Sequence, residues 1–202
     1  MSIYLIGSIS IVLIILYFID LKRHKIKTRE ITMIGMSVAI SYVLYMIPLI
    51  RYPQGGGITL FSMLPIMLLS LVYGRTIGVT SGLIFGLLKL LNGAFIIHPV
   101  QFILDYLLST MALGLAGSFG INKKYKIFLG AFMASGLSTL ICVISGAVFF
   151  GQYAPKGMNV WIYSLIYNVS SMGLEGLMTS VILALMPINL LVKRMNPGKN
   201  KI

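Results

Sequence analysis

Runs of apolar residues long enough to cross a lipid bilayer recur along this chain. They lie at about residues 3–19, 31–50, 58–73, 76–92, 99–119, 127–150 and 160–192. A bilayer core of about 30 Å requires roughly 20 apolar residues in a helix. Backbone polar groups in lipid must be satisfied within the chain, so each run is expected to be helical. With 58% hydrophobic residues and only 4 acidic ones, the sequence predicts an all-α, polytopic transmembrane helix bundle.

The basic residues are placed as membrane topology requires. The net charge is +12, but most of it lies in groups just outside the apolar runs. These groups are Lys22, Arg23, Lys25, Lys27 and Arg29; Lys123, Lys124 and Lys126; and Lys193, Arg194, Lys199 and Lys201. Cytoplasmic loops carry such an excess, which predicts an outside N-terminus and a cytoplasmic C-terminus. The same placement argues against nucleic acid as a partner.

Several other classes of protein lack support in the sequence. The single cysteine, Cys142, excludes an intrachain disulfide. The histidines and carboxylates show no metal-ligand spacing, and the chain has no P-loop for binding ATP phosphates. We therefore expect no cofactor, no metal and no enzymatic activity.

Asp105 is the sharpest candidate for a functional residue. It lies six residues after Pro99, within an apolar run. A carboxylate near the bilayer centre costs about 2.5–3.5 kcal/mol and is usually functional or paired. The functional interpretation is a ligand contact; the structural alternative is an ion pair with Lys89. The same argument applies to Glu175 in the last apolar run. The glycine-rich segment 52–57 suits a mobile lid.

Three segments resemble a known family. They read LPIMLLSLVYG, then HPVQFILDYLL with MALGLAG, then SGAVFFGQYAPKGM followed by YSLIYN. In this order they are similar to the thiamine-specific substrate-binding (S) components of energy-coupling factor (ECF) vitamin transporters. The resemblance implies a six-helix core that holds the vitamin near the outer face of a bacterial plasma membrane. It also implies an ECF module, a coupling protein with two ATPases, that docks on small residues of the first core helix, here Gly35 and Ala39.

The resemblance also implies a set of binding residues. They are Asp105, Tyr106, Cys142, Gly146, Phe150, Tyr163 and Asn168. Asp105 stands where the family usually has Glu, Cys142 where well-studied members have a histidine, and Phe150 where they have a tryptophan. A tryptophan of the family's lid is missing from the segment around residues 52–61.

These observations combine into one hypothesis. Residues 1–30 are predicted to be an extra N-terminal transmembrane helix with a basic loop, residues 31–194 the six-helix vitamin-binding domain, and residues 195–202 a basic tail. The predicted function is thiamine capture for an ATP-driven ECF transporter. The alternatives are a thiamine precursor or another flat heterocycle as ligand, an intramembrane enzyme that uses Asp105 and Glu175, and a purely structural membrane subunit.

Overall fold

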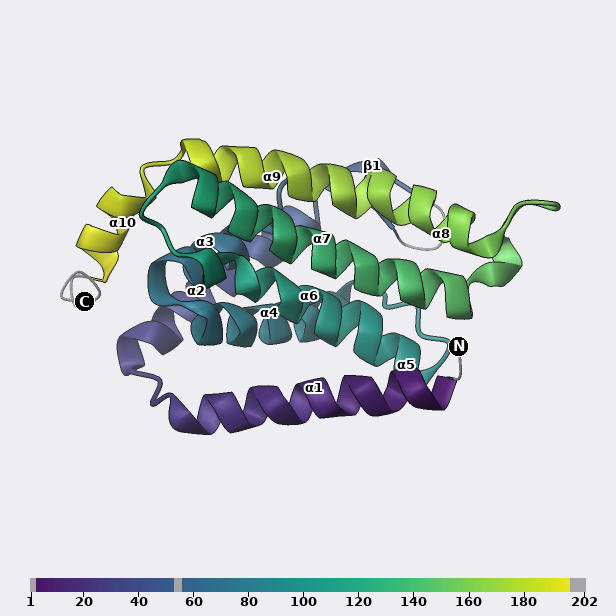
Figure 1. Ribbon diagram of the computed structural model, residues 1–202, viewed down its shortest axis with the longest axis horizontal. Helices are drawn as coiled ribbons and strands as arrows, with labels where there is room; N and C mark the ends of the chain where they lie inside the picture. Colours follow the sequence, from purple (N-terminus) through teal and green to yellow (C-terminus); the bar gives the residue numbers. More distant parts are fainter. Residues whose placement is uncertain (1–2, 53–55, 197–202) are drawn as a thin grey trace.

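The computed structural model describes residues 3–52 and 56–196 (Figure 1). Its helices run along the long axis of the molecule, with one two-stranded hairpin beside them. The elements are α1 (Ile3–Arg23), α2 (Thr28–Tyr45), β1 (Pro48–Arg51), β2 (Gly57–Thr59), α3 (Leu64–Tyr73), α4 (Arg75–Lys89), α5 (Pro99–Phe102), α6 (Ser109–Leu113), α7 (Lys124–Phe149), α8 (Val160–Asn168), α9 (Leu174–Leu185) and α10 (Ile188–Met195). The prediction of an all-α polytopic bundle is confirmed.

Some neighbouring helices join end to end through turns of different pitch. A π-helical turn, Ile103–Leu108, joins α5 to α6, and a 3-10 turn extends the helix to Phe119. A second π-helical turn, Val169–Gly173, joins α8 to α9. Within the described residues, the helices long and apolar enough to cross a membrane are four: α1, Pro99–Phe119, α7 and Val160–Leu185.

The second and third predicted spans are shorter as helices than expected. Residues 31–50 were expected to be helical throughout, but α2 ends at Tyr45 and β1 follows. Pro48 explains the break, because proline lacks an N–H and disfavours helical backbone at the preceding residue. In the 58–73 run, β2 pairs antiparallel with β1 and helix starts only at Leu64. Of the predicted lid segment, residues 53–55 lie outside the described part of the chain.

The last predicted span, 160–192, is divided at a proline. The sequence predicts a kink or stop at Pro187, and this is confirmed, because α9 ends at Leu185 and α10 starts at Ile188. Met186 has extended backbone, with φ −65° and ψ 147°, as expected of a residue before proline. The short helix α10 then buries Ile188 and Val192 against the bundle.

Glycines on α4 bring it into close contact with the Pro99–Phe119 helix. A Cβ on Gly82 would overlap the backbone of Thr110, and a Cβ on Gly86 would overlap the backbone of Tyr106. Small residues allow such close helix approach in lipid. The four-residue spacing predicted tight internal packing for these glycines, and the structure confirms it. This packing fixes the position of the backbone around Asp105.

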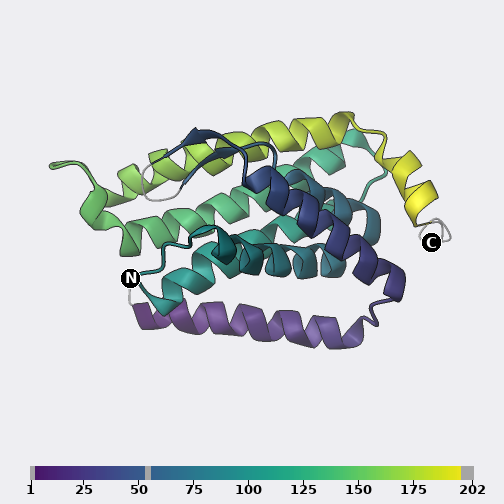
Figure 2. The same ribbon diagram turned by 180° about the vertical axis from the view of Figure 1, so that it is seen from behind.

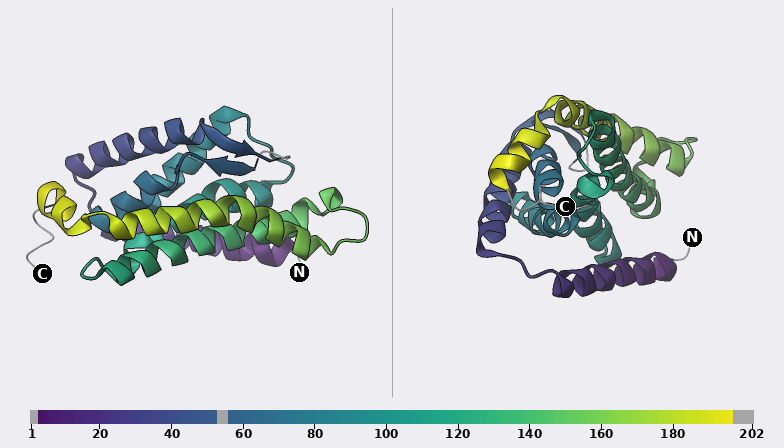
Figure 3. Two further views of the ribbon diagram at one scale, coloured as in Figure 1. Left: turned by 90° about the horizontal axis from the view of Figure 1, so that it is seen from above. Right: turned by 60° about the vertical axis from the view of Figure 1, so that its left-hand side comes forward.

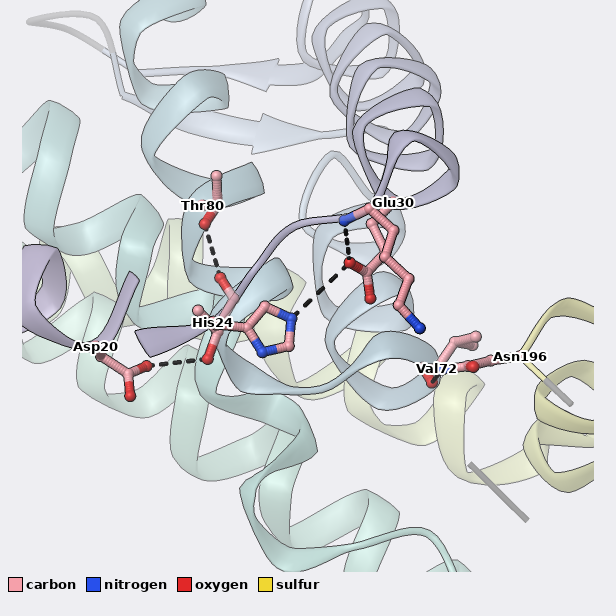
Figure 4. Close-up of polar contacts among 8 residues, drawn as sticks. Asp20, His24, Glu30, Val72, Thr80 and Asn196 are labelled. Atoms are coloured by element: carbon pink, nitrogen blue, oxygen red, sulfur yellow. Dashed lines mark hydrogen bonds and ion pairs between the residues drawn. The ribbon is translucent and has the colours of Figure 1, made fainter. Parts of the chain in front are cut away.

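The first helix stands outside the ring formed by the other helices (Figure 3). It packs against the Pro99–Phe119 helix through a cluster that includes Ile6 and Tyr17. The Tyr17 hydroxyl donates to Thr80 Oγ1 at 2.9 Å. Asp20, which Figure 4 shows near the end of α1, accepts a hydrogen bond from Thr76 Oγ1 at 2.9 Å. Apolar side chains cover most of the remaining surface of α1.

The two ends of the bundle differ in charge. In Figures 1 and 2 the α1–α2 connection, the start of α7 and helix α10 lie at one end, and the described N-terminus lies at the other. The basic groups of the α1–α2 connection, of α7 and of α10 therefore share one end; Lys199 and Lys201 lie outside the described residues. Arg75 is at this end too, because it lies 3.7 Å from Asp20 Oδ1.

Candidate functional site

A cavity of about 170 Å³ lies between the C-terminal half of α7, the start of the Pro99–Phe119 helix and α8. The parts of these helices that line it lie toward the end of the bundle opposite the basic groups (Figure 1). Every residue predicted for the binding site lines it: Asp105, Tyr106, Cys142, Gly146, Phe150, Tyr163 and Asn168. Residues that are up to 63 positions apart in the sequence thus line one cavity. The structure shows that these residues lie close together.

Asp105 is held by a neighbouring amide on the same helix. It sits in the π-helical turn Ile103–Leu108, a type of irregularity that occurs frequently at functional sites. The Gln101 side chain donates to Asp105 Oδ2 at 2.7 Å. Gln101 Nε2 also donates to the carbonyl of Phe95 at 3.2 Å, and Gln101 Oε1 accepts from the N–H of Ile97 at 3.3 Å. Gln101 is only 1% exposed, so a buried side chain fixes the orientation of the Asp105 carboxylate.

Sequence reasoning missed Gln101. The signal was present, because a glutamine four residues before Asp105 lies on the same helix face. A polar residue of no charge in an apolar run did not stand out beside the carboxylate.

Lys89 does not form the ion pair with Asp105 that the structural alternative proposed. The ion pairs within residues 3–52 and 56–196 are Asp20–Arg75 and His24–Glu30. The Lys89 ammonium instead lies over the rings of Tyr45, Phe85 and Tyr106, at 5.0, 5.9 and 5.8 Å from their centroids. Such cation–π contacts contribute about 0.5–1 kcal/mol each, and more where water is excluded.

Aromatic rings form the outer part of the cavity wall. Phe150 lies 6.0 Å from Phe95 and 6.3 Å from Tyr153, measured between ring centroids. Tyr163 and Tyr167 pack at 6.1 Å along α8. These π-faces lie around a cavity that contains one carboxylate, an arrangement that suits a flat cationic or hydrogen-bonding ligand.

Close packing between α7 and α8 sets the floor of the cavity. Gly146 faces Ser164, and a Cβ at Gly146 would overlap the Ser164 hydroxyl. Ser164 donates to the carbonyl of Val143 at 2.7 Å, and Asn168 Nδ2 donates to the carbonyl of Ser164 at 2.9 Å. Cys142 is 8% exposed and its carbonyl is 3.4 Å from Asn168 Nδ2. The close packing of α7 against α8 beside the cavity therefore requires a residue as small as glycine at position 146.

Glu175 lies in a second cavity, of about 340 Å³, beneath the hairpin. Tyr45, Gly56, Lys89, Gly93 and Met172 line both cavities, so the two adjoin. The described residues contain no group of three or more His, Cys, Asp or Glu side chains that could hold a metal ion. The predicted docking residues Gly35 and Ala39 are both exposed, away from either cavity, and nothing lies within 4 Å of a Cβ placed on Gly35.

Taken together, these features define a polytopic membrane protein with a ligand-sized pocket at one end of a helix bundle. The family described as "Thiamine transporter protein" matches residues 31–194. Similar proteins include the thiamine transporter ThiT of Bacillus subtilis (strain 168), 38% identical over 147 residues, which are 66% of this chain and 76% of that protein. ThiT of Lacticaseibacillus paracasei is 31% identical over 142 residues, which are 62% of this chain and 71% of that protein.

The fold is also shared with a solved structure. ThiT from Listeria monocytogenes superimposes with a TM-score of 0.70 at 22% sequence identity, over 83% of this chain and 94% of that chain. The chain therefore belongs to the thiamine transporter protein family. This is a family of transporters, so the enzyme alternative is set aside.

Proposed function

We propose that this chain is the thiamine-binding S-component of an ECF transporter. The observation that carries the proposal is the position of Asp105, fixed by Gln101 at 2.7 Å inside a cavity with aromatic walls. The family match over residues 31–194 and the relatives named as thiamine transporters support thiamine as the ligand.

Thiamine has groups that complement this pocket. Its thiazolium ring is cationic, which suits a carboxylate and the π-face of a ring such as Phe150. Its aminopyrimidine ring offers an amino donor and nitrogen acceptors, which Asp105, Tyr163 and Asn168 can match as acceptor, hydroxyl and amide. We therefore assign Asp105, Tyr106, Cys142, Gly146, Phe150, Tyr163 and Asn168 to the binding site as part of the proposal.

The proposed orientation places the pocket at the outer face of a bacterial plasma membrane. The basic groups lie at the opposite end of the bundle, and cytoplasmic loops are enriched in Lys and Arg. This arrangement supports an outside N-terminus and a cytoplasmic C-terminus. Thiamine would then enter from the cell exterior.

Transport is proposed to require an ECF module with a coupling protein and two ATPases. Gly35 and Ala39 lie on an exposed face of α2, where small residues permit close approach of a partner helix.

The family match starts at residue 31, which supports residues 1–30 as a separate anchor, residues 31–194 as the vitamin-binding domain and residues 195–202 as a tail.

Equilibrium binding of radiolabelled thiamine to the detergent-purified full chain tests the proposal. We expect saturable binding at one site per chain, with unlabelled thiamine displacing the label at lower concentration than its isolated aminopyrimidine or thiazole alcohol. Displacement by the aminopyrimidine at equal or lower concentration would instead establish a precursor as the ligand. Absence of saturable thiamine binding in protein that is folded by circular dichroism would overturn the proposal.

A further inference from the structure

Glu175 is a buried carboxylate outside the proposed thiamine pocket. It lies in the first turn of α9, is only 2% exposed and lines the second cavity rather than the first. The ion pairs described above do not include it. Burying a carboxylate without a counter-ion is costly unless strong hydrogen bonds compensate, so its hydrogen-bond partners show what it stabilises.

Those partners come from the hairpin and the turn after it. The backbone N–H of Thr59, at the end of β2, donates to Glu175 Oε2 at 2.8 Å. The Thr59 hydroxyl lies 2.9 Å from both carboxylate oxygens, and the Ser62 hydroxyl donates to Oε1 at 3.2 Å. Glu175 is 116 residues from Thr59 in the sequence. One charged side chain therefore fastens the base of the hairpin to α9.

The same hairpin contacts the thiamine pocket a few residues away. The N–H of Gly56 donates to the Tyr167 hydroxyl at 3.1 Å, and the rings of Tyr52 and Tyr167 pack edge to face at 5.4 Å. Gly56 and Tyr167 both line the pocket. Tyr167 and Glu175 belong to one continuous helix, Val160–Leu185, and Figure 2 shows the hairpin lying along it.

We infer that Glu175 is a positioning residue for ligand retention: by holding Thr59 and Ser62, it fixes the hairpin so that Gly56 and Tyr52 stay against Tyr167. The inference rests on the proposed function for its ligand, but its structural part does not. Without the carboxylate, Thr59 at the end of β2 is held by the pairing of β2 with β1. The hairpin then moves away from Tyr167 more often, and the pocket opens on that side. Ligand dissociation accelerates, whereas the helix bundle stays folded.

The test compares three variants with the wild type. Glu175→Gln has nearly the same size but loses the charge. It leaves one neutral acceptor oxygen where the carboxylate has two for Thr59 and Ser62. Thr59→Val removes the hydroxyl and keeps the N–H, and it leaves the bundle helices untouched. Glu30→Gln is the matched control, because the Glu30 carboxylate also accepts a backbone N–H, that of Lys27, at 2.8 Å (Figure 4), but in the first turn of α2, at the basic end of the bundle.

Two quantities are measured for each protein. The first is the rate of trypsin cleavage after Arg51, which is exposed on β1, without ligand; cleavage of a locally opened segment reports its opening equilibrium. The second is the dissociation rate of radiolabelled thiamine. Because hydrogen bonds to charged groups are strong, we expect Glu175→Gln to raise both rates about tenfold or more and Thr59→Val to raise both by a smaller factor. Glu30→Gln should leave both unchanged, with similar melting temperatures for all.

The outcomes separate this inference from the proposed function. If the wild type fails to bind thiamine, the proposed function falls, and the Arg51 cleavage rates alone still test whether Glu175 holds the hairpin. Wild-type cleavage and dissociation rates in both Glu175→Gln and Thr59→Val would overturn the inference. An equal increase in Glu30→Gln would also overturn it, because the effect would then be a general loss of stability. If Glu175→Gln does not fold, Thr59→Val decides by the same criteria.

Discussion

Replacement of Asp105 by Asn tests the charge at the centre of the proposed pocket. The substitution keeps the size of the side chain and removes its charge. The Gln101 amide, now 2.7 Å from Oδ2, can still donate to the remaining oxygen of an asparagine. A neutral amide also costs less to bury than an anion. The free energy of unfolding should therefore change little.

Thiamine affinity should respond much more strongly. A hydrogen bond to a charged group contributes about 1.5–3 kcal/mol. Since about 1.4 kcal/mol corresponds to a tenfold change in Kd, Asp105→Asn should weaken binding by about tenfold to a hundredfold. Isothermal titration calorimetry of the purified variant measures this directly, with differential scanning fluorimetry for stability.

Asp20→Asn supplies the matched control. Asp20 also accepts a hydrogen bond, from Thr76 at 2.9 Å, but it lies at the basic end of the bundle. It should leave the Kd unchanged. Unchanged affinity in a stable Asp105→Asn protein would refute the assignment of Asp105 as a ligand contact.

The Asp105→Asn variant also decides the role of Lys89. Its ammonium lies over three aromatic rings instead of pairing with Asp105, so Asp105→Asn should not leave it unpaired. If the two residues were a structural pair, Asp105→Asn would lower the melting temperature and adding Lys89→Met would restore it. We expect no such rescue.

Three further predictions concern other parts of the molecule. A cysteine introduced at Lys124 in a Cys142→Ala background should resist an impermeant thiol reagent added to intact cells, and labelling from outside would contradict the proposed orientation. Leucine at Gly35 and Ala39 should reduce uptake into proteoliposomes that contain the ECF module and ATP by at least about tenfold while leaving the thiamine Kd within about twofold, because both residues are exposed and a bulky side chain blocks close helix approach; loss of binding would show that this face packs internally. Thiamine should slow the reaction of Cys142, which lines the pocket, with a small thiol reagent, and no protection at saturating thiamine would remove it from the binding site.

The sequence was most informative where a residue was out of place for its surroundings. Asp105 stood out because a carboxylate in an apolar run is costly, and the structure places it in the cavity. Pro187 predicted the end of α9 because proline cannot continue a helix without losing a hydrogen bond. The small residues of α4 predicted close packing, which Gly82 and Gly86 show.

Other features depend on contacts between distant residues. The hairpin forms from residues whose apolar character is equally typical of a membrane helix, and at Thr59 it is hydrogen-bonded to Glu175, 116 residues further along the chain. The π-helical turn that contains Asp105 leaves no mark on apolar periodicity. Lys89 was expected beside a carboxylate because charge alone suggests an ion pair, whereas three rings from α2, α4 and the Pro99–Phe119 helix gather around it only in the folded chain.

The central claim is that thiamine binds between Asp105 and the aromatic wall that includes Phe150. The most direct test is an experimental structure of the full chain purified with saturating thiamine. We expect one thiamine molecule in the cavity of about 170 Å³, with a ring nitrogen or the amino group within hydrogen-bond distance of the Asp105 carboxylate and a ring facing Phe150. Thiamine bound elsewhere, with this cavity holding only water and Asp105 contacting only Gln101, would contradict it.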